Sequence, residues 1–175
     1  RRHTTYGLWA TPPVVNARMR GVEVPAYRYA GLIVASTLRL DELERAEANE
    51  RAASDISCAL LPDPPREPAG EQWTYRWDSN EGIPSLSLAR TQDGLLLRFA
   101  KLADFTISAG GRRIGAWPAQ GTTSATLRHL LLDQVLPRVL AHMGRLVLHA
   151  SAVRLQGGSI AFLGPTGTGK STLAA

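Results

Sequence analysis

Short runs of apolar residues alternate with glycine, proline and polar clusters over the first 117 positions of the chain. The short apolar runs at residues 6–10, 27–36 and 55–61 predict strands, and the longest of them, 27–36, contains β-branched and aromatic side chains. Residues 42–53 are charged and rich in alanine, and they predict a short exposed helix. The proline-rich residues 62–70 predict a loop, because proline is excluded from helix interiors and central strands. This part of the chain is therefore expected to be mostly β.

Three segments with turn-forming residues separate further runs of strand type and predict β-hairpins. They are residues 79–82, 92–94 and 109–111. The second is supported by Leu86 and Leu88, which alternate with serine before the turn.

Three aromatic residues, Trp73, Tyr75 and Trp77, stand at alternate positions. A regular strand would place all three rings on one face. Such a stripe could bind a ligand or stack a base, but we expect it to cover the core of the β-rich part.

A helix is predicted next, with Thr122 or Thr123 as its N-cap. Pro137 should kink or restart this helix, and Gly144 should end it. The expected apolar face comprises Leu127, Leu130, Leu131, Val135, Leu136, Val139, Leu140 and Met143.

Residues 145–153 are apolar on both faces of a strand, which predicts that this strand is buried. The glycine pair at 157–158 predicts a two-residue turn into a second strand at residues 159–163.

The second strand runs into the spacing G-x-x-x-x-G-K-[ST], which helix-forming residues follow. Glycines allow successive backbone N–H groups to turn toward a phosphate, and the start of a helix adds positive potential. We expect Lys170 to contact the β- and γ-phosphates and Ser171 to ligate Mg²⁺. The alternative is a glycine-rich turn that happens to contain a lysine. The expected nucleotide-binding residues are Gly164, Pro165, Thr166, Gly167, Thr168, Gly169, Lys170, Ser171 and Thr172.

The histidines differ in their expected roles. If the glycine pair is the turn, Ser151 lies opposite Gly164, and His149 lies two residues, roughly 7 Å, beyond the start of the loop. We therefore treat His149 as a catalytic candidate that handles a proton or orients a group near the transferred phosphoryl. The alternative for His149 is a core histidine bonded to a backbone carbonyl. His129 and His142 are expected at the surface.

Composition changes this picture little. The chain has 175 residues, 44% of them hydrophobic, which supports a packed core. The net charge of +5 comes mainly from scattered arginines, so we expect an ordinary solvated surface and no nucleic-acid partner. Cys58 is the single cysteine, which excludes an internal disulfide and fits a reducing cytoplasm. No apolar run approaches the roughly 18 residues of a membrane span. Because the chain lacks an initiator methionine and stops soon after Ser171, we expect that it is cut at both ends.

The segment Leu148-His149-Ala150-Ser151-Ala152-Val153, the glycine pair and the loop from Phe162 to Ala174 resemble the HPr kinase/phosphorylase family, and more closely the HPr-kinase-like serine kinases. The close match covers roughly residues 136–175, and the resemblance upstream is weak. The resemblance to this family implies an α/β protein that is α+β overall. A small β-rich N-terminal domain (1–121) and a kinked connecting helix (122–144) would precede the start of a P-loop kinase domain (145–175).

The resemblance also implies ATP and Mg²⁺ as cofactors and a protein or peptide serine as the acceptor. In that family the loop lysine and serine match Lys170 and Ser171, and a histidine beside the catalytic aspartate matches His149. The family's aspartate and its other metal-binding acids lie downstream of the loop and are not in this sequence. Serine phosphorylation is therefore expected only of the full-length parent.

Two other functions stay open. A transport ATPase can share the Gly-Lys-Ser-Thr-Leu spelling, although the long β-rich lead and the strand with His149 count against it. A regulatory module could instead sense nucleotide without turnover while the β-rich part recognises a partner. No membrane partner is expected, and the oligomeric state is left open, a homo-oligomer included.

Overall fold

The computed structural model describes residues 18–19, 22–51, 53–62, 73–78, 84–165 and 167–174. Two short strands, β1 (Arg18–Met19) and β2 (Val22–Glu23), pair with each other ahead of the main sheet. The main sheet contains β3 (Ala26–Tyr29), β4 (Leu32–Ser36), β5 (Ile56–Leu60), β6 (Trp73–Asp78), β7 (Pro84–Thr91), β8 (Gly94–Phe99), β9 (Ala103–Ser108) and β10 (Arg113–Pro118).

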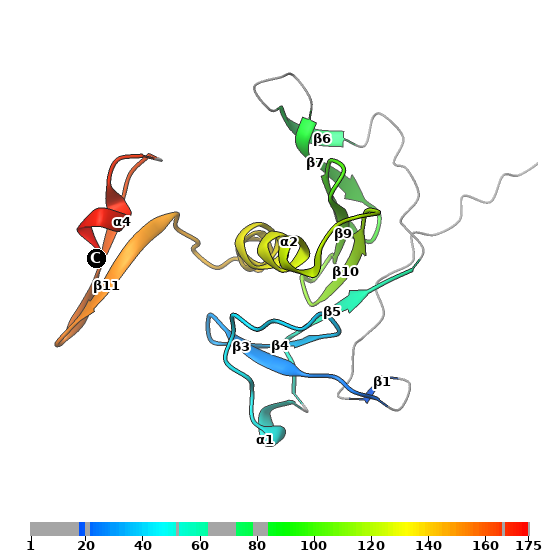
Figure 1. Ribbon diagram of the computed structural model, residues 1–175, viewed down its shortest axis with the longest axis horizontal. Helices are drawn as coiled ribbons and strands as arrows, with labels where there is room; N and C mark the ends of the chain where they lie inside the picture. Colours follow the sequence, from blue (N-terminus) through cyan, green and yellow to red (C-terminus); the bar gives the residue numbers. More distant parts are fainter. Residues whose placement is uncertain are drawn as a thin grey trace, which may run out of the picture.

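These eight strands form one sheet in the order β3-β4-β5-β10-β9-β8-β7-β6 (Figure 1). Strand β5 is parallel to both of its neighbours, β4 and β10, and the remaining pairs are antiparallel. The described part of the chain is thus a mixed α/β structure that is mostly β, as the alternation of apolar and turn residues predicts.

Two of the predicted hairpins are confirmed. Residues 92–93 form the turn between β7 and β8, and residues 109–112 connect β9 to β10. The predicted turn at residues 79–82 lies outside the described residues. The single strand expected at residues 27–36 is instead the hairpin β3–β4, whose turn uses Ala30 and Gly31 with φ of 49° and 74°.

The other predictions for the β-rich part of the chain are confirmed only in part. The strand expected at 55–61 is β5. Among the described residues of the helix expected at 42–53, only α1 (Ala48–Arg51) is helical. The Arg28 guanidinium bonds Glu44 and Glu50 at 2.6 and 2.7 Å, and these ion pairs tie the segment that contains α1 to β3. The run at 6–10 and most of the loop at 62–70 lie outside the described residues.

The aromatic stripe on β6 does not have the predicted geometry. A β-bulge between Trp73 and Tyr75 shifts the register, so Trp73 pairs with Ala89 whereas Tyr75 pairs with the adjacent Leu88. Successive partners on β7 point to opposite faces, so Trp73 lies on the other face from Tyr75. Tyr75 and Trp77 are 58% and 46% exposed and stack on each other at 5.7 Å, so the predicted core role of the stripe is wrong for them.

The predicted helix packs on one face of the sheet. It comprises α2 (Ser124–His129), the π-helical turn η2 (Leu130–Val135) and α3 (Leu136–His142), with Thr123 as the N-cap. Proline lacks an N–H group, and the helix widens just before Pro137, where the Leu136 N–H bonds the Leu131 carbonyl. The helix ends beside Gly144, which has φ of 80°. The prediction of a helix interrupted at Pro137 is therefore confirmed.

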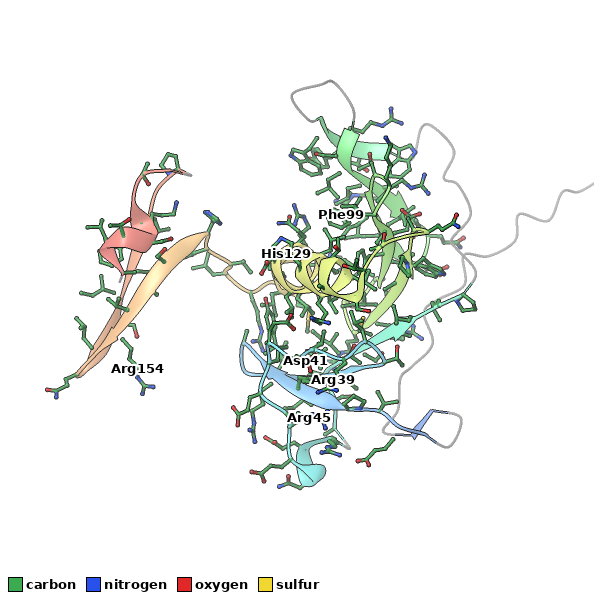
Figure 2. The ribbon with its side chains drawn as sticks, in the orientation of Figure 1. Arg39, Asp41, Arg45, Phe99, His129 and Arg154 are labelled. Carbon is green, nitrogen blue, oxygen red and sulfur yellow. The ribbon has the colours of Figure 1, made fainter. Side chains whose placement is uncertain are left out.

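The space between helix and sheet holds the main apolar cluster, and Figure 2 shows side chains such as Phe99 filling it. All the predicted stripe residues belong to this cluster or pack against it. Cys58 on β5 is fully buried there, and burial raises the pKa of its thiol to about 12. The thiol is therefore protonated and unreactive in the folded chain.

Residues 145–163 depart from expectation. Residues 145–149 are not a strand, and β11 begins only at Ala150 (Ala150–Leu155). It pairs with β12 (Gly158–Leu163) in a separate two-stranded sheet, which Figure 1 shows apart from the eight-stranded one. The predicted burial is wrong here, because most residues of β11 and β12 are exposed. Exposed apolar residues of this segment are Leu146, Val147, Leu148, Leu155, Ile160 and Leu163.

We predict that Gly94→Ala strongly destabilises the sheet. Gly94 has φ of 145°, and a Cβ there would lie 1.9 Å from the Ile107 carbonyl oxygen on β9. We expect the free energy of unfolding to fall by about 3 kcal/mol or more in urea titrations. Gly110→Ala is the control, because a Cβ at Gly110 meets nothing within 4 Å. Equal stability of the two variants would contradict the steric argument.

We also predict that the chain associates through the β11–β12 hairpin. Its strands have unpaired outer edges among the described residues, and Ile160 and Leu163 are 47% and 61% exposed. Sedimentation should show concentration-dependent oligomers that Leu163→Lys reduces. Leu102→Lys, at a 39% exposed apolar residue in the turn between β8 and β9, should leave them unchanged. A monomer at all concentrations would contradict the prediction.

Candidate phosphate-binding site

The hairpin β11–β12 leads into the glycine-rich loop, and its pairing register determines which residues lie beside the start of the loop. Leu155 pairs with Gly158, so the turn is Gln156–Gly157, one residue earlier than predicted. Gly157 supplies the positive φ, 88°, that such a turn requires. Because the pairing slips by two residues, every side chain keeps its predicted face but faces a different partner.

The slip moves His149 relative to the loop. Ala150 pairs with Leu163, so continuing the register puts His149 level with Gly164 rather than two residues beyond it. The predicted pairing of Ser151 with Gly164 is wrong, because Ser151 pairs with Phe162.

The loop itself is closed by local hydrogen bonds. The Thr168 hydroxyl donates to the Pro165 carbonyl at 2.8 Å, and its backbone N–H reaches the same oxygen at 3.4 Å. Gly167 and Gly169 have φ of 85° and 79°, a backbone conformation that other residues rarely adopt. Their conformation fits the predicted role of glycine in this loop. Thr166 lies outside the described residues.

Lys170 folds back over this loop. Its ammonium donates to the carbonyls of Gly164 and Pro165, both at 2.8 Å. These bonds hold the positive charge at the mouth of the loop, where a phosphate oxygen can replace the carbonyls as acceptor. Lys170 also begins α4 (Lys170–Leu173), which has a single turn and therefore contributes little of the helix dipole expected from the sequence.

One hollow brings the candidate residues together. It has a volume of about 520 Å³ and is lined by His149, Ala150, Ser151, Gly167, Gly169, Lys170, Ser171 and Thr172. Three further candidates belong to the same loop but are not among the residues that line the hollow: Gly164, Pro165 and Thr168. His149 is exposed, and no hydrogen bond of its ring is found among the described residues, so the core-histidine interpretation is wrong.

Lys170 supplies the fixed positive charge of the hollow, and no carboxylate is among its described lining residues. A search of the described residues finds no cluster of three or more metal-binding side chains. The glycine conformations and the ammonium fit a phosphate group. For Mg²⁺ the hollow offers the Ser171 hydroxyl, which suits a metal that takes most of its ligands from water and phosphate.

The other histidines lie where the sequence predicts. His129 is exposed and pairs with Asp133 at 2.6 Å on the outer side of the helix. The ring of His142, also exposed, lies 2.7 Å from the Ala109 carbonyl oxygen. Neither residue lines the hollow that contains Lys170.

Sequence reasoning gave no role to Ser151, although it follows His149 by two positions and so shares its face of the strand predicted at residues 145–153. In the structure its hydroxyl oxygen lies 3.3 Å from that of Ser171. The alternation along the strand is the signal that could have singled it out.

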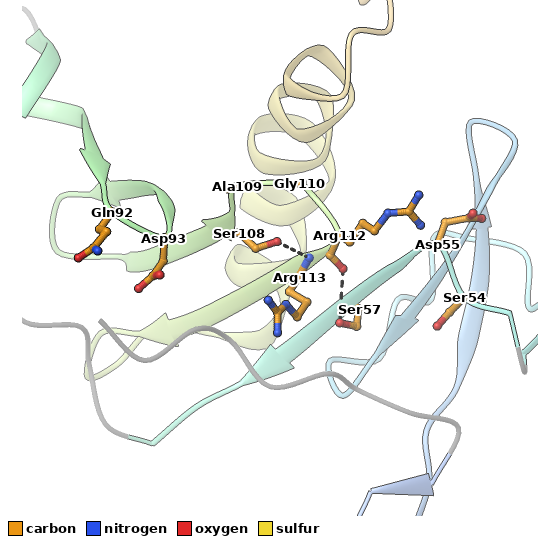
Figure 3. Close-up of a pocket in the computed structure, with 10 residues that line it drawn as sticks. All are labelled: Ser54, Asp55, Ser57, Gln92, Asp93, Ser108, Ala109, Gly110, Arg112 and Arg113. Carbon is orange, nitrogen blue, oxygen red and sulfur yellow. Dashed lines mark hydrogen bonds between the residues drawn. The ribbon is translucent and has the colours of Figure 1, made fainter. Parts of the chain in front are cut away.

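A second hollow, of about 540 Å³, lies at the ends of β5, β9 and β10 (Figure 3). Arg112, Arg113, Asp55 and Asp93 line it with mixed charge. The hydroxyls of Ser57 and Ser108 in its wall already bond backbone groups of the two arginines. Sequence reasoning treated the arginines of the chain only as scattered surface charge.

Comparison with protein-family models, with curated proteins and with solved structures finds no match for this chain. Within the described part of the chain, no helix has the length and apolar character needed to cross a membrane.

Proposed function

We propose that this chain is the ATP-binding N-terminal portion of an HPr-kinase-like serine kinase. The observation that carries the proposal is the single hollow in which Lys170, Ser171 and His149 meet beside two glycines of positive φ. A glycine-rich turn without function would not require a lysine, a hydroxyl and a histidine from two separate segments on one concave surface.

The roles of the residues follow from their chemistry. The loop N–H groups and the Lys170 ammonium bind and orient the phosphates, and Lys170 offsets negative charge that develops on the γ-phosphate. Ser171 provides one ligand for Mg²⁺, which supplies charge neutralisation when bound. His149, on the strand side of the hollow, orients or assists the carboxylate base that activates an acceptor serine. That carboxylate, and the transfer itself, belong to the full-length parent.

The partners and location are part of the same proposal. A nucleotide and a protein or peptide serine are the substrates, and an ATP-dependent enzyme of this type would act in the cytoplasm. We propose neither a nucleic acid nor a membrane as partner.

A second candidate is a module that binds nucleotide without turning it over. It is favoured by the lack of a carboxylate among the described residues that line the hollow. No comparable observation favours a transport ATPase.

Lys170→Ala should weaken binding of a fluorescent ATP analogue by about 10- to 100-fold, because a charge-assisted bond to phosphate is lost. The main sheet should keep its unfolding midpoint, since the Lys170 ammonium bonds the Gly164 and Pro165 carbonyls of the loop and Lys170 belongs to neither apolar cluster. Lys101→Gln, at the only other lysine, should leave affinity within about twofold. Unchanged affinity in Lys170→Ala would end the phosphate-loop assignment.

In the full-length protein, His149→Ala should lower kcat by about 100-fold while ATP affinity changes less than about threefold. The reason is that a residue handling a proton acts on transfer rather than on binding. Steady-state kinetics with an acceptor protein would measure both. The exposed His129→Ala is the matched control. Parallel loss of kcat and affinity, or loss of folding, would restore a structural role for His149.

A further inference from the structure

The Ser151 and Ser171 hydroxyls meet across the two segments that form the hollow. Ser151 lies on β11, where its backbone is held opposite Phe162, and Ser171 lies in the single turn of α4. Their oxygens are 3.3 Å apart, longer than the usual 2.7–2.8 Å of a hydroxyl pair, so the contact is weak as it stands. Both residues line the hollow that also contains Lys170.

The chemistry of a hydroxyl makes this contact informative. A serine hydroxyl carries one proton and two lone pairs. If Ser171 ligates a cation, one lone pair must face the cation and the proton must point to an acceptor elsewhere. The Ser151 oxygen is the acceptor that the structure places beside it.

We propose that Ser151 is a positioning residue that accepts the proton of Ser171 and so turns a Ser171 lone pair toward Mg²⁺. The inference rests on the proposed function and deepens it, because it assigns the orientation of the metal ligand to the strand before the loop. Residues that hydrogen-bond a metal ligand, without touching the metal themselves, commonly change metal affinity in this way. The segment that contains both residues would then serve the site twice, with His149, just before β11, toward the reacting group and Ser151, on β11, toward the metal ligand.

The test is binding of a fluorescent ATP analogue to the 175-residue chain, with and without Mg²⁺. Ser151→Val and Ser151→Thr are a matched pair, because both are β-branched and suit a strand but only threonine keeps a hydroxyl. We expect Ser151→Val to reduce the Mg²⁺-dependent gain in affinity about tenfold and Ser151→Thr to retain most of it. Affinity without Mg²⁺ should stay within about twofold for both variants.

A double-mutant cycle shows whether Ser151 acts through Ser171. The double variant Ser151→Val with Ser171→Ala should lose no more of the Mg²⁺-dependent gain than Ser171→Ala alone. Additive losses, or a full Mg²⁺-dependent gain in Ser151→Val, would overturn the inference and leave the phosphate-loop proposal intact. If the unaltered chain shows no Lys170-dependent binding, the proposed function fails, and the inference fails with it.

Discussion

The apolar contact between the helix and the sheet is the constraint on which the fold depends. Leu131, Val135, Leu136 and Val139 are fully buried, and they meet side chains from strands across the sheet. Without this layer the inner face of an eight-stranded sheet would be open to water, at roughly 25 cal/mol for each Å² of apolar surface. The π-helical turn η2 (Leu130–Val135), just before Pro137, keeps the stripe continuous past a residue that would otherwise break the helix. Also, Tyr29 on β3 donates to the Leu132 carbonyl at 3.4 Å in this turn.

Local patterns predicted the local elements. The turn at residues 92–93, the N-cap at Thr123 and the buried stripe all follow from residue types within a few positions of one another. The β3–β4 turn was missed because Ala30 is an unusual residue for positive φ. The predicted face of Trp73 was wrong because a β-bulge breaks the two-residue alternation of side chains along β6. The parallel pairing of β5 with β4 and β10 joins segments too distant in sequence for any local pattern to reveal.

The site shows the same division between local and distant effects. The loop spacing predicted which residues form the loop, because backbone conformation and side-chain chemistry are fixed within it. The position of His149 relative to the loop depends on which residues form the hairpin turn. A shift of two residues in the pairing of β11 with β12 changed the residue that lies level with His149. The burial of residues 145–163 depends on neighbours that no internal pattern specifies. Ser151 was overlooked because its significance appears only when β11 and α4 are placed side by side.

The hairpin that leads into the glycine-rich loop lies outside both apolar clusters of the described chain, neither of which includes a residue beyond Met143. A hydrogen bond from the Arg145 guanidinium to the Ala30 carbonyl, at 2.9 Å, links the connecting segment to the β3–β4 turn. Substitutions in the sheet core and in the loop therefore have little shared packing through which to couple, and their effects should be close to additive. The stability of the domain and the chemistry of the loop can then change independently in evolution.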